Sequence, residues 1–190
     1  LESVVGGERF GRYSFIGLPA HTLLRASGFG EQAVTEVVTR GVVQEVARGN
    51  PLDFIEQYQA RFKVALLPGM PRFCGGLAGY FGYDTVRHIE KKLQHGCPPD
   101  ALGTPDILLL QCEELAVIDN LSGKLYLLVY VDPAQPEAYS HGKRRLRELR
   151  ERLHRPAMPP AAGMFRKEPI ERSFAKDDYL QAVERAKELI

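Results

Sequence analysis

The first residues of the chain combine side chains that could bind a small charged molecule. A carboxylate and a hydroxyl, Glu2 and Ser3, stand shortly before a glycine-rich turn, and a strand with further polar positions follows that turn. A carboxylate attracts an ammonium group, while a hydroxyl and free backbone N–H groups can receive a carboxylate. The set therefore suits a small zwitterion. A purely structural interpretation, a turn with an exposed Glu2 and a capping Ser3, fits the same spacing.

A second glycine-rich segment, FCGGLAGYFG, covers residues 73–82. Its spacing matches neither the G-x-G-x-x-G fingerprint of dinucleotide sites nor the P-loop, which needs Lys and then Ser or Thr after its last glycine. We interpret the segment as a central strand. Glycines at every third or fourth position allow another backbone to pack closely or relieve a kink. The glycines concerned are Gly75, Gly76, Gly79 and Gly82.

Other patterns that could carry chemistry do not form a catalytic set. The five histidines are scattered, with neither an HExxH motif nor a His/Cys pair at zinc spacing. No G-x-S-x-G elbow surrounds a serine. The basic stretch at residues 143–152 includes Glu148, four residues after Arg144, which is the spacing of helical ion pairs and indicates a solvated helix face. We therefore expect neither catalytic residues nor metal ligands in this chain.

Composition narrows the class of protein further. The 190 residues include 25 Lys and Arg against 24 Asp and Glu, a net charge of +1. This balance argues against a protein that binds duplex nucleic acid or a membrane surface through many basic groups. Three cysteines without CxxC spacing favour a reduced, cytoplasmic setting. No apolar run approaches the ~20 residues needed to span a bilayer, and no signal peptide opens the chain.

Residue patterns predict a strand-rich first half. The expected strands cover residues 12–18, 22–26, 33–39 and 42–47, with a hairpin turn at Arg40-Gly41. A helix should follow, with Asn50 as N-cap, Pro51 at its first position and its end near Lys63. Its apolar face is expected to comprise Leu52, Ile55, Gln59 and Phe62, with Tyr58 at the flank.

The second half mixes strands and helices. Residues 83–92 predict a short helix, and residues 95–105 a mobile loop. Residues 106–119 predict a long strand or a pair broken near Glu113-Glu114, and a turn at residues 120–123 leads to a strand at 124–131. Helical periodicity covers residues 136–154, with Leu146, Leu149 and Leu153 on one face. The last helix should be capped by Asp177 or Asp178.

The order of these elements lacks β-α-β alternation and therefore indicates an α+β fold. We expect a regulatory α+β region at residues 1–154, a proline-rich linker at 155–172, and at 173–190 the first helix of a further domain. The chain begins inside a patterned segment and stops inside a helix. We therefore expect it to be a piece of a longer protein.

Two long motifs resemble one family closely. LESxxGGERFGRYSFIG at residues 1–17 and FCGGLAGYFGYDTVRHIE at residues 73–90 resemble the N-terminal region of anthranilate synthase component I. Pro105-Asp106 with the run to Asp119 agrees with that family, as does the stretch at residues 173–190, although Ser173-Phe174 departs from the commoner Ser-Asn-Phe. The resemblance covers nearly the whole chain.

The resemblance implies a fold and an activity for the whole enzyme. Members of this family are α+β proteins with two facing, mostly antiparallel β-sheets and helices packed outside. They are lyases that convert chorismate to anthranilate and pyruvate in tryptophan biosynthesis, with ammonia from a glutamine amidotransferase subunit and with Mg²⁺. The chorismate and Mg²⁺ sites lie in the C-terminal half, which would follow Ile190. By resemblance, this fragment holds none of the catalytic residues.

The resemblance also implies an allosteric site for L-tryptophan, the feedback inhibitor. Glu2 and Ser3 match the acidic and hydroxyl members of the family's L-L-E-S motif, and Leu1 matches its second leucine. Arg12 and Ser14 fall near a basic-and-serine position of the same site, in a looser alignment.

Two alternatives stay open. Aminodeoxychorismate synthase component I, which makes a folate precursor, shares the family's fold. From a different class, the chain could be a stand-alone amino-acid-binding module without a catalytic partner domain. The aromatic product of the full-length protein distinguishes the first alternative from anthranilate synthase. The sequence after Ile190 distinguishes the second, because a stand-alone module would lack a catalytic domain there.

Overall fold

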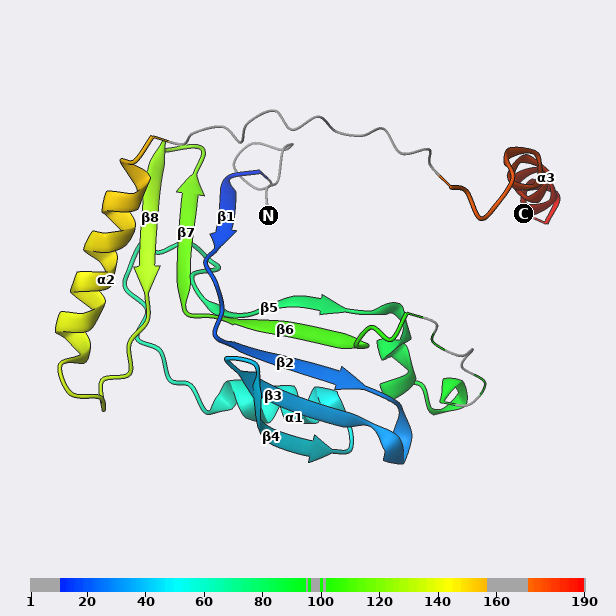
Figure 1. Cartoon of the computed structure of the whole chain (residues 1–190), viewed down its shortest axis with the longest axis horizontal. Coiled ribbons are helices and arrows are strands. Elements are labelled where there is room, and N and C mark those ends of the chain that lie inside the picture. Colours follow the sequence, from blue (N-terminus) through cyan, green and yellow to red (C-terminus); the bar gives the residue numbers. More distant parts are fainter. Residues whose placement is uncertain (1–10, 95, 97–99, 101, 157–170, 190) are drawn as a thin grey trace. The chain divides into compact units, whose positions relative to one another are not determined.

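The structure is a computed structural model that describes residues 11–94, 96, 100, 102–156 and 171–189 (Figure 1). The chain divides into two compact units, residues 1–155 and residues 156–190. Among its described residues, the first unit contains two antiparallel sheets with an α-helix on each, which confirms the predicted α+β fold. The second unit contains one described helix, α3.

The smaller sheet has three antiparallel strands in the order β1-β7-β8. Its strands are β1 Tyr13–Gly17, β7 Glu114–Asp119 and β8 Lys124–Val129. Tyr13 is paired with Asp119, so the start of β1 lies beside the turn that joins β7 to β8. One face of the sheet packs on a buried cluster of Cys74, Cys112, Leu115, Val117 and Leu128.

The larger sheet has five antiparallel strands in the order β4-β3-β2-β6-β5. Its strands are β2 Thr22–Ser27, β3 Val34–Thr39, β4 Val42–Arg48, β5 Gly76–Phe81 and β6 Ile107–Cys112. The predicted hairpin is confirmed, because Arg40 and Gly41 both have positive φ (51° and 80°) between β3 and β4. The glycine-rich strand β5 lies at the edge, so the prediction of a central strand is wrong.

Only Glu113 separates β6 from β7, yet these strands belong to different sheets. The expected break near Glu113-Glu114 is therefore confirmed as a change of sheet. The segment between β1 and β2 makes the second crossing (Figure 1). At these crossings the N–H of Leu18 donates to the carbonyl oxygen of Glu114 at 3.2 Å, and the N–H of Tyr130 donates to that of Glu113 at 2.9 Å.

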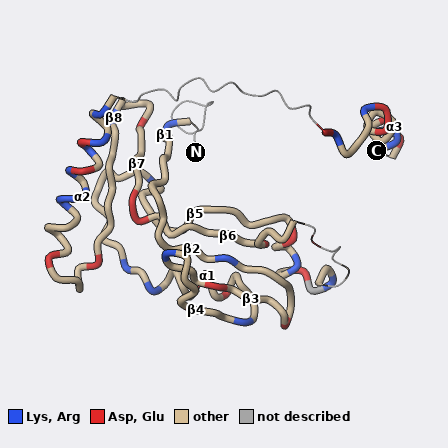
Figure 2. The backbone as a smooth tube through the Cα atoms, in the orientation of Figure 1, with Lys and Arg blue, Asp and Glu red and all other residues tan. Residues whose placement is uncertain are grey.

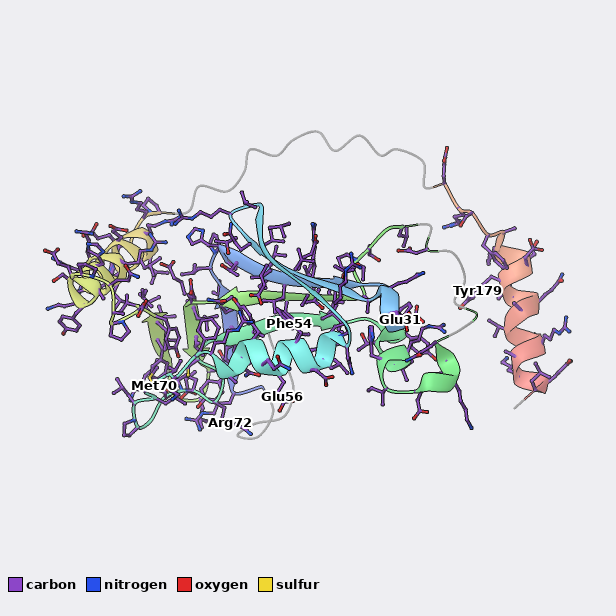
Figure 3. All side chains as sticks on the ribbon, turned by 90° about the horizontal axis from the view of Figure 1, so that it is seen from below. Glu31, Phe54, Glu56, Met70, Arg72 and Tyr179 are labelled. Carbon is purple, nitrogen blue, oxygen red and sulfur yellow. The ribbon has the colours of Figure 1, made fainter. Side chains whose placement is uncertain are left out.

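Helix α1, Pro51–Ala60, begins as its sequence predicts. The side chain of Asn50 accepts a hydrogen bond from the N–H of Leu52 at 3.1 Å, so it caps the helix. Figure 3 shows Phe54 on the side of α1 toward the five-stranded sheet and Glu56 on the side away from it. The predicted face is partly wrong, because Tyr58 is buried and donates to Gln111 Oε1 at 2.6 Å. The face toward the sheet comprises the buried Ile55 and Tyr58, three residues apart, with the half-buried Leu52 and Phe54 beside them. Gln59 and Phe62 are exposed.

Helix α2, Ala138–Leu153, packs on β8. Leu149 is buried and Leu146 is half-buried, as the periodicity predicts, whereas Leu153 is exposed. Basic and acidic residues follow one another along the helix (Figure 2). The predicted pairing of Glu148 with Arg144 is wrong, because Glu148 pairs with Arg145 at 3.1 Å. Arg145 also reaches across to Glu114 on β7 at 2.7 Å and so ties the helix to the sheet.

The remaining helices are three short 3₁₀ turns in the first unit and helix α3 in the second unit. Residues 83–92, predicted as one helix, form the 3₁₀ turns η2 Tyr83–His88 and η3 Lys91–Leu93, and a third turn, η1, spans Gly30–Gln32. Helix α3 spans Lys176–Glu188. Its N-cap is Ala175, and Asp177 and Asp178 lie in the first turn, where they complement the helix dipole. The prediction that one of these aspartates caps the helix is therefore wrong.

Candidate functional site

The predicted ligand set falls partly outside the described residues. Leu1, Glu2 and Ser3 lie within residues 1–10, which are outside the described residues. Arg12 and Ser14 are described, and both lie where β1 begins, beside the turn between β7 and β8. The structure thus brings together these two members of the predicted set.

Arg12 makes a two-point ion pair with Asp119, the last residue of β7. Its Nε and Nη2 donate to the two carboxylate oxygens at 3.1 and 2.9 Å. Only 2% of the Asp119 side chain is exposed, against 38% for Arg12. The Arg12 guanidinium also lies 5.0 Å from the centre of the Tyr13 ring. Paired guanidinium and carboxylate groups of this geometry hold each other in a fixed orientation.

Asp119 also shapes the turn that follows it. Its Oδ1 accepts hydrogen bonds from the backbone N–H groups of Leu121 and Ser122 at 3.1 and 3.4 Å. The hydrogen bond from Arg12, together with those from the turn, holds the pKa of Asp119 well below its usual range, although burial opposes this shift. The carboxylate is therefore ionised at neutral pH and its charge is compensated inside the fold.

Asn120, the first residue of the turn after β7, also binds the start of β1. Its Nδ2 donates to the carbonyl oxygen of Gly11 and to Oγ of Ser14, both at 3.1 Å. Its backbone N–H donates to the carbonyl oxygen of Arg12 at 2.7 Å. Ser14 is 9% exposed, so its hydroxyl serves the structure of this corner. We call Gly11, Arg12, Ser14, Asp119 and Asn120 the Arg12–Asp119 cluster.

Arg12 has N–H donors that no described residue of the cluster accepts. Arg12 uses Nε and Nη2 for Asp119, and Nη1 has no partner among the described residues. A partly exposed guanidinium with an unused N–H pair can bind a carboxylate. The sequence did not identify Asp119 and Asn120 as part of a site. The only available signal was the expected turn at residues 120–123, whose side-chain contacts span more than 100 residues of sequence.

A second polar corner surrounds His88 at the end of η2. Its Nε2 is buried without a hydrogen-bond partner among the described residues. Burial lowers the pKa of His88 and raises that of Asp106, whose Oδ2 accepts from the N–H of Gly28 at 3.0 Å. The His88 ring lies 5.2 Å from that of Phe29. Burial in this corner therefore favours the neutral form of the imidazole.

The structure adds two findings on metals and membranes, both limited to the described part of the chain. It contains no group of three or more His, Cys, Asp or Glu side chains placed to hold a metal ion. None of its helices combines the length and the apolar character needed to cross a membrane.

Comparison with known proteins connects this architecture to a family. The family profile described as chorismate binding enzyme matches residues 19–190, which is most of the chain. This chain belongs to the chorismate-binding enzyme family. The match includes both sheets of the first unit apart from β1, as well as helix α3.

Individual members of the chorismate-binding family agree over the whole chain. It is 47% identical to anthranilate synthase component 1 of Neisseria meningitidis serogroup C, in an alignment that covers 100% of this chain and 38% of that protein. Its identity to anthranilate synthase component 1 of Pseudomonas aeruginosa is 45%, covering 100% of this chain and 39% of the relative. The chain thus spans less than two-fifths of the length of these relatives.

A solved structure shows the same fold. The crystal structure of anthranilate synthase component I from Streptococcus pneumoniae TIGR4 matches with a TM-score of 0.58 at 25% sequence identity. The match covers 83% of this chain and 32% of that structure. The sequence resemblance to the anthranilate synthase component I family is therefore confirmed.

Proposed function

We propose that this chain is the N-terminal, tryptophan-sensing part of an anthranilate synthase component I. The observation that carries the proposal is the 45–47% identity to proteins of that name along the entire chain. The full-length protein would convert chorismate and ammonia to anthranilate and pyruvate in the cytoplasm. Its partner would be a glutamine amidotransferase subunit that supplies the ammonia. Chorismate and Mg²⁺ would bind in the part of the protein beyond this chain.

The chemistry of the ligand set supports a sensor for a free amino acid. Glu2 supplies a negative charge for the ammonium group of tryptophan, and Ser3 a hydroxyl for its carboxylate. Arg12 adds unused donors for the same carboxylate, in a position that its ion pair with Asp119 fixes. Leu1 and Ser14 complete the proposed set, Leu1 as an apolar neighbour of the indole ring and Ser14 as a support of the strand.

Feedback inhibition needs two states of the enzyme with different affinities for tryptophan. The inhibitor would favour the state in which chorismate or the amidotransferase subunit is badly placed. Couplings of this kind typically amount to about 1–3 kcal/mol, which corresponds to roughly 5–150-fold in affinity. By linkage, chorismate must weaken tryptophan binding by the same factor.

Substitution of Ser3 tests the proposal. In the full-length protein we expect Ser3→Ala to raise the tryptophan concentration that gives half-inhibition, with nearly unchanged turnover in the absence of tryptophan. Ser27→Ala is the matched control, because Ser27 is an exposed serine at the end of β2 in the five-stranded sheet and is not a member of the proposed ligand set. Turnover of chorismate is followed against tryptophan concentration for all three proteins. Inhibition of Ser3→Ala at the wild-type tryptophan concentration contradicts the assignment of Ser3.

A further inference from the structure

The two edges of the five-stranded sheet differ in how they are protected against further pairing. Edge strands expose unpaired N–H and C=O groups, and proteins guard such edges with charged side chains, bulges or covering segments. Strand β4 carries Glu45 and Arg48, and its pairing with β3 shifts register between Val37 and Val38. Strand β5 has the sequence GLAGYF, without a charge or a proline, and its pairing with β6 runs along the strand without a shift. In the described part of the chain, the β5 edge therefore has none of these protective features.

The backbone of β5 presents a regular row of hydrogen-bonding groups at this edge (Figure 1). The N–H of Gly82, the residue after β5, donates to the carbonyl oxygen of Asp106 at 2.7 Å. In an antiparallel pair, residues that bond to the partner strand alternate with residues that point away from it. Counting back from Gly82 in steps of two therefore assigns Tyr80 and Ala78 to β6. The intervening residues direct their N–H and C=O groups away from β6, and they are Leu77, Gly79 and Phe81.

Aromatic side chains flank this edge on both faces of the sheet. Tyr80 and Phe81 are successive residues, so they lie on opposite faces, and they are 41% and 53% exposed. Leu110, opposite Ala78 on β6, is 40% exposed. The hydroxyl of Tyr80 donates to the carbonyl oxygen of Pro105 at 2.8 Å, which fixes the end of β5 against the chain before β6. A strand placed beside β5 would bury apolar surface on both faces and would pair the free backbone groups.

The rest of the same polypeptide is the partner that best fits this edge. The chain covers 38% and 39% of the two relatives described above, so about three-fifths of such a protein lies outside it. A strand of the same polypeptide meets β5 at a high effective concentration, an advantage that a separate molecule lacks. The edge also carries no charged side chain through which a separate partner would be selected.

We propose that β5 is an interior strand of the sheet in the full-length protein, where a strand from outside this chain pairs with Leu77, Gly79 and Phe81. The inference rests on the proposed function only in that the full-length protein is longer than this chain, and it requires no particular product or inhibitor. It accounts for the apolar, uncharged sequence of β5, which is typical of a buried strand. A helix against the same edge would leave the free backbone groups without evenly spaced partners.

Amide exchange of the full-length protein, resolved to single residues by fragmentation in the mass spectrometer, tests the pairing. Ala78 and Tyr80 are internal references, because β6 protects their N–H groups whether or not another strand is present. We expect the N–H groups of Leu77, Gly79 and Phe81 to exchange within about tenfold of these references. Exchange more than about a hundredfold faster, as at an open edge, overturns the inference.

A photo-reactive side chain in place of Phe81 identifies the partner strand. With Phe81→benzoylphenylalanine in the full-length protein, we expect cross-links within one molecule to peptides outside residues 1–190. Cross-links confined to residues 1–190 overturn the assignment of the partner, as do links between two copies or the absence of any link.

Two lysine substitutions at opposite edges of the sheet complete the test. Phe81→Lys places a charge where the additional strand would pack, and we expect the N–H groups of Leu77 and Gly79 to exchange at least about tenfold faster. Val42→Lys is the matched control, because Val42 is 60% exposed on β4. There we expect unchanged exchange in β5. An equal change in β5 in both variants, or none in either, overturns the inference. A product other than anthranilate refutes the proposed function and leaves these exchange results as they are.

Discussion

Gly79 offers a direct test of how the glycine-rich strand is built. Gly79 lies in β5 opposite Leu109 of β6, and a Cβ at this position would overlap the carbonyl oxygen of Leu108. It would also lie 2.9 Å from Cα of Leu109, a distance that real Cβ atoms essentially never show. The atoms in the way belong to the backbone of β6, so no side-chain rotation relieves the overlap. In Gly79→Ala, β5 must therefore move away from its partner.

The size of the effect follows from these contacts. Overpacking of a close contact costs typically 1–3 kcal/mol, and the hydrogen bonds weakened beside Gly79 contribute about 1 kcal/mol each. Among the described residues, β5 is paired with β6 alone, so its opening depends mainly on this pair. We expect Gly79→Ala to lower the free energy of opening of this strand pair by about 2–4 kcal/mol. Amide exchange then accelerates about 30–1000-fold, since 1.4 kcal/mol is a factor of ten.

Hydrogen–deuterium exchange of the full-length protein, read by mass spectrometry on peptides from residues 76–81 and 107–112, measures this change. Gly17→Ala is the control, because Gly17 also lies in a strand but has no atom within 4 Å of the added Cβ. There we expect unchanged or slightly slower exchange, since alanine restricts the unfolded chain. Equal exchange in the two variants would refute the close-approach explanation of Gly79.

Two other substitutions test the smaller sheet. Leu149→Ala should lower the free energy of unfolding by about 2–4 kcal/mol, because Leu149 of α2 is 5% exposed where the helix packs on the sheet. Faster amide exchange confined to α2 and β8 supports this expectation. A change in the free energy of unfolding below about 0.5 kcal/mol contradicts it. The pKa of Asp119 is depressed in the fold, so its ion pair stabilises the protein fully above the unfolded pKa near 4, and this stabilisation is lost as the pH falls below that value. Asp119→Asn should therefore flatten the fall in stability between neutral pH and pH 3, measured by circular dichroism, and an unchanged slope would contradict the role of the ion pair.

Local signals in the sequence predicted local structure well. Asn50 and Pro51 begin α1, and Arg40-Gly41 forms the hairpin turn, because capping and positive φ depend on a few adjacent residues. The alternation of apolar residues was also sufficient to identify most strands. The order of the strands within the sheets could not be predicted from these local patterns. The glycine-rich β5 appears central by composition, but its place at the edge depends on pairing with β6, about 30 residues later.

The candidate site divides in the same way. The spacing of Glu2 and Ser3 predicts a zwitterion site, and these residues lie outside the described part of the chain. Arg12 and Ser14 were reached only through resemblance to a family. Their partners Asp119 and Asn120 are 107 and 106 positions away in the two contacts that matter most. Contacts at such separation leave no periodic pattern in a single sequence, so only the folded chain reveals the cluster.

The product that the full-length protein forms from chorismate tests the central claim most directly. The protein is supplied with chorismate, ammonia and Mg²⁺, and the products are separated by chromatography and identified by mass spectrometry. The account predicts anthranilate and pyruvate in equal amounts, with formation of both suppressed by added tryptophan. Accumulation of aminodeoxychorismate without pyruvate, unaffected by tryptophan, would contradict the account and assign the chain to the folate branch of the family.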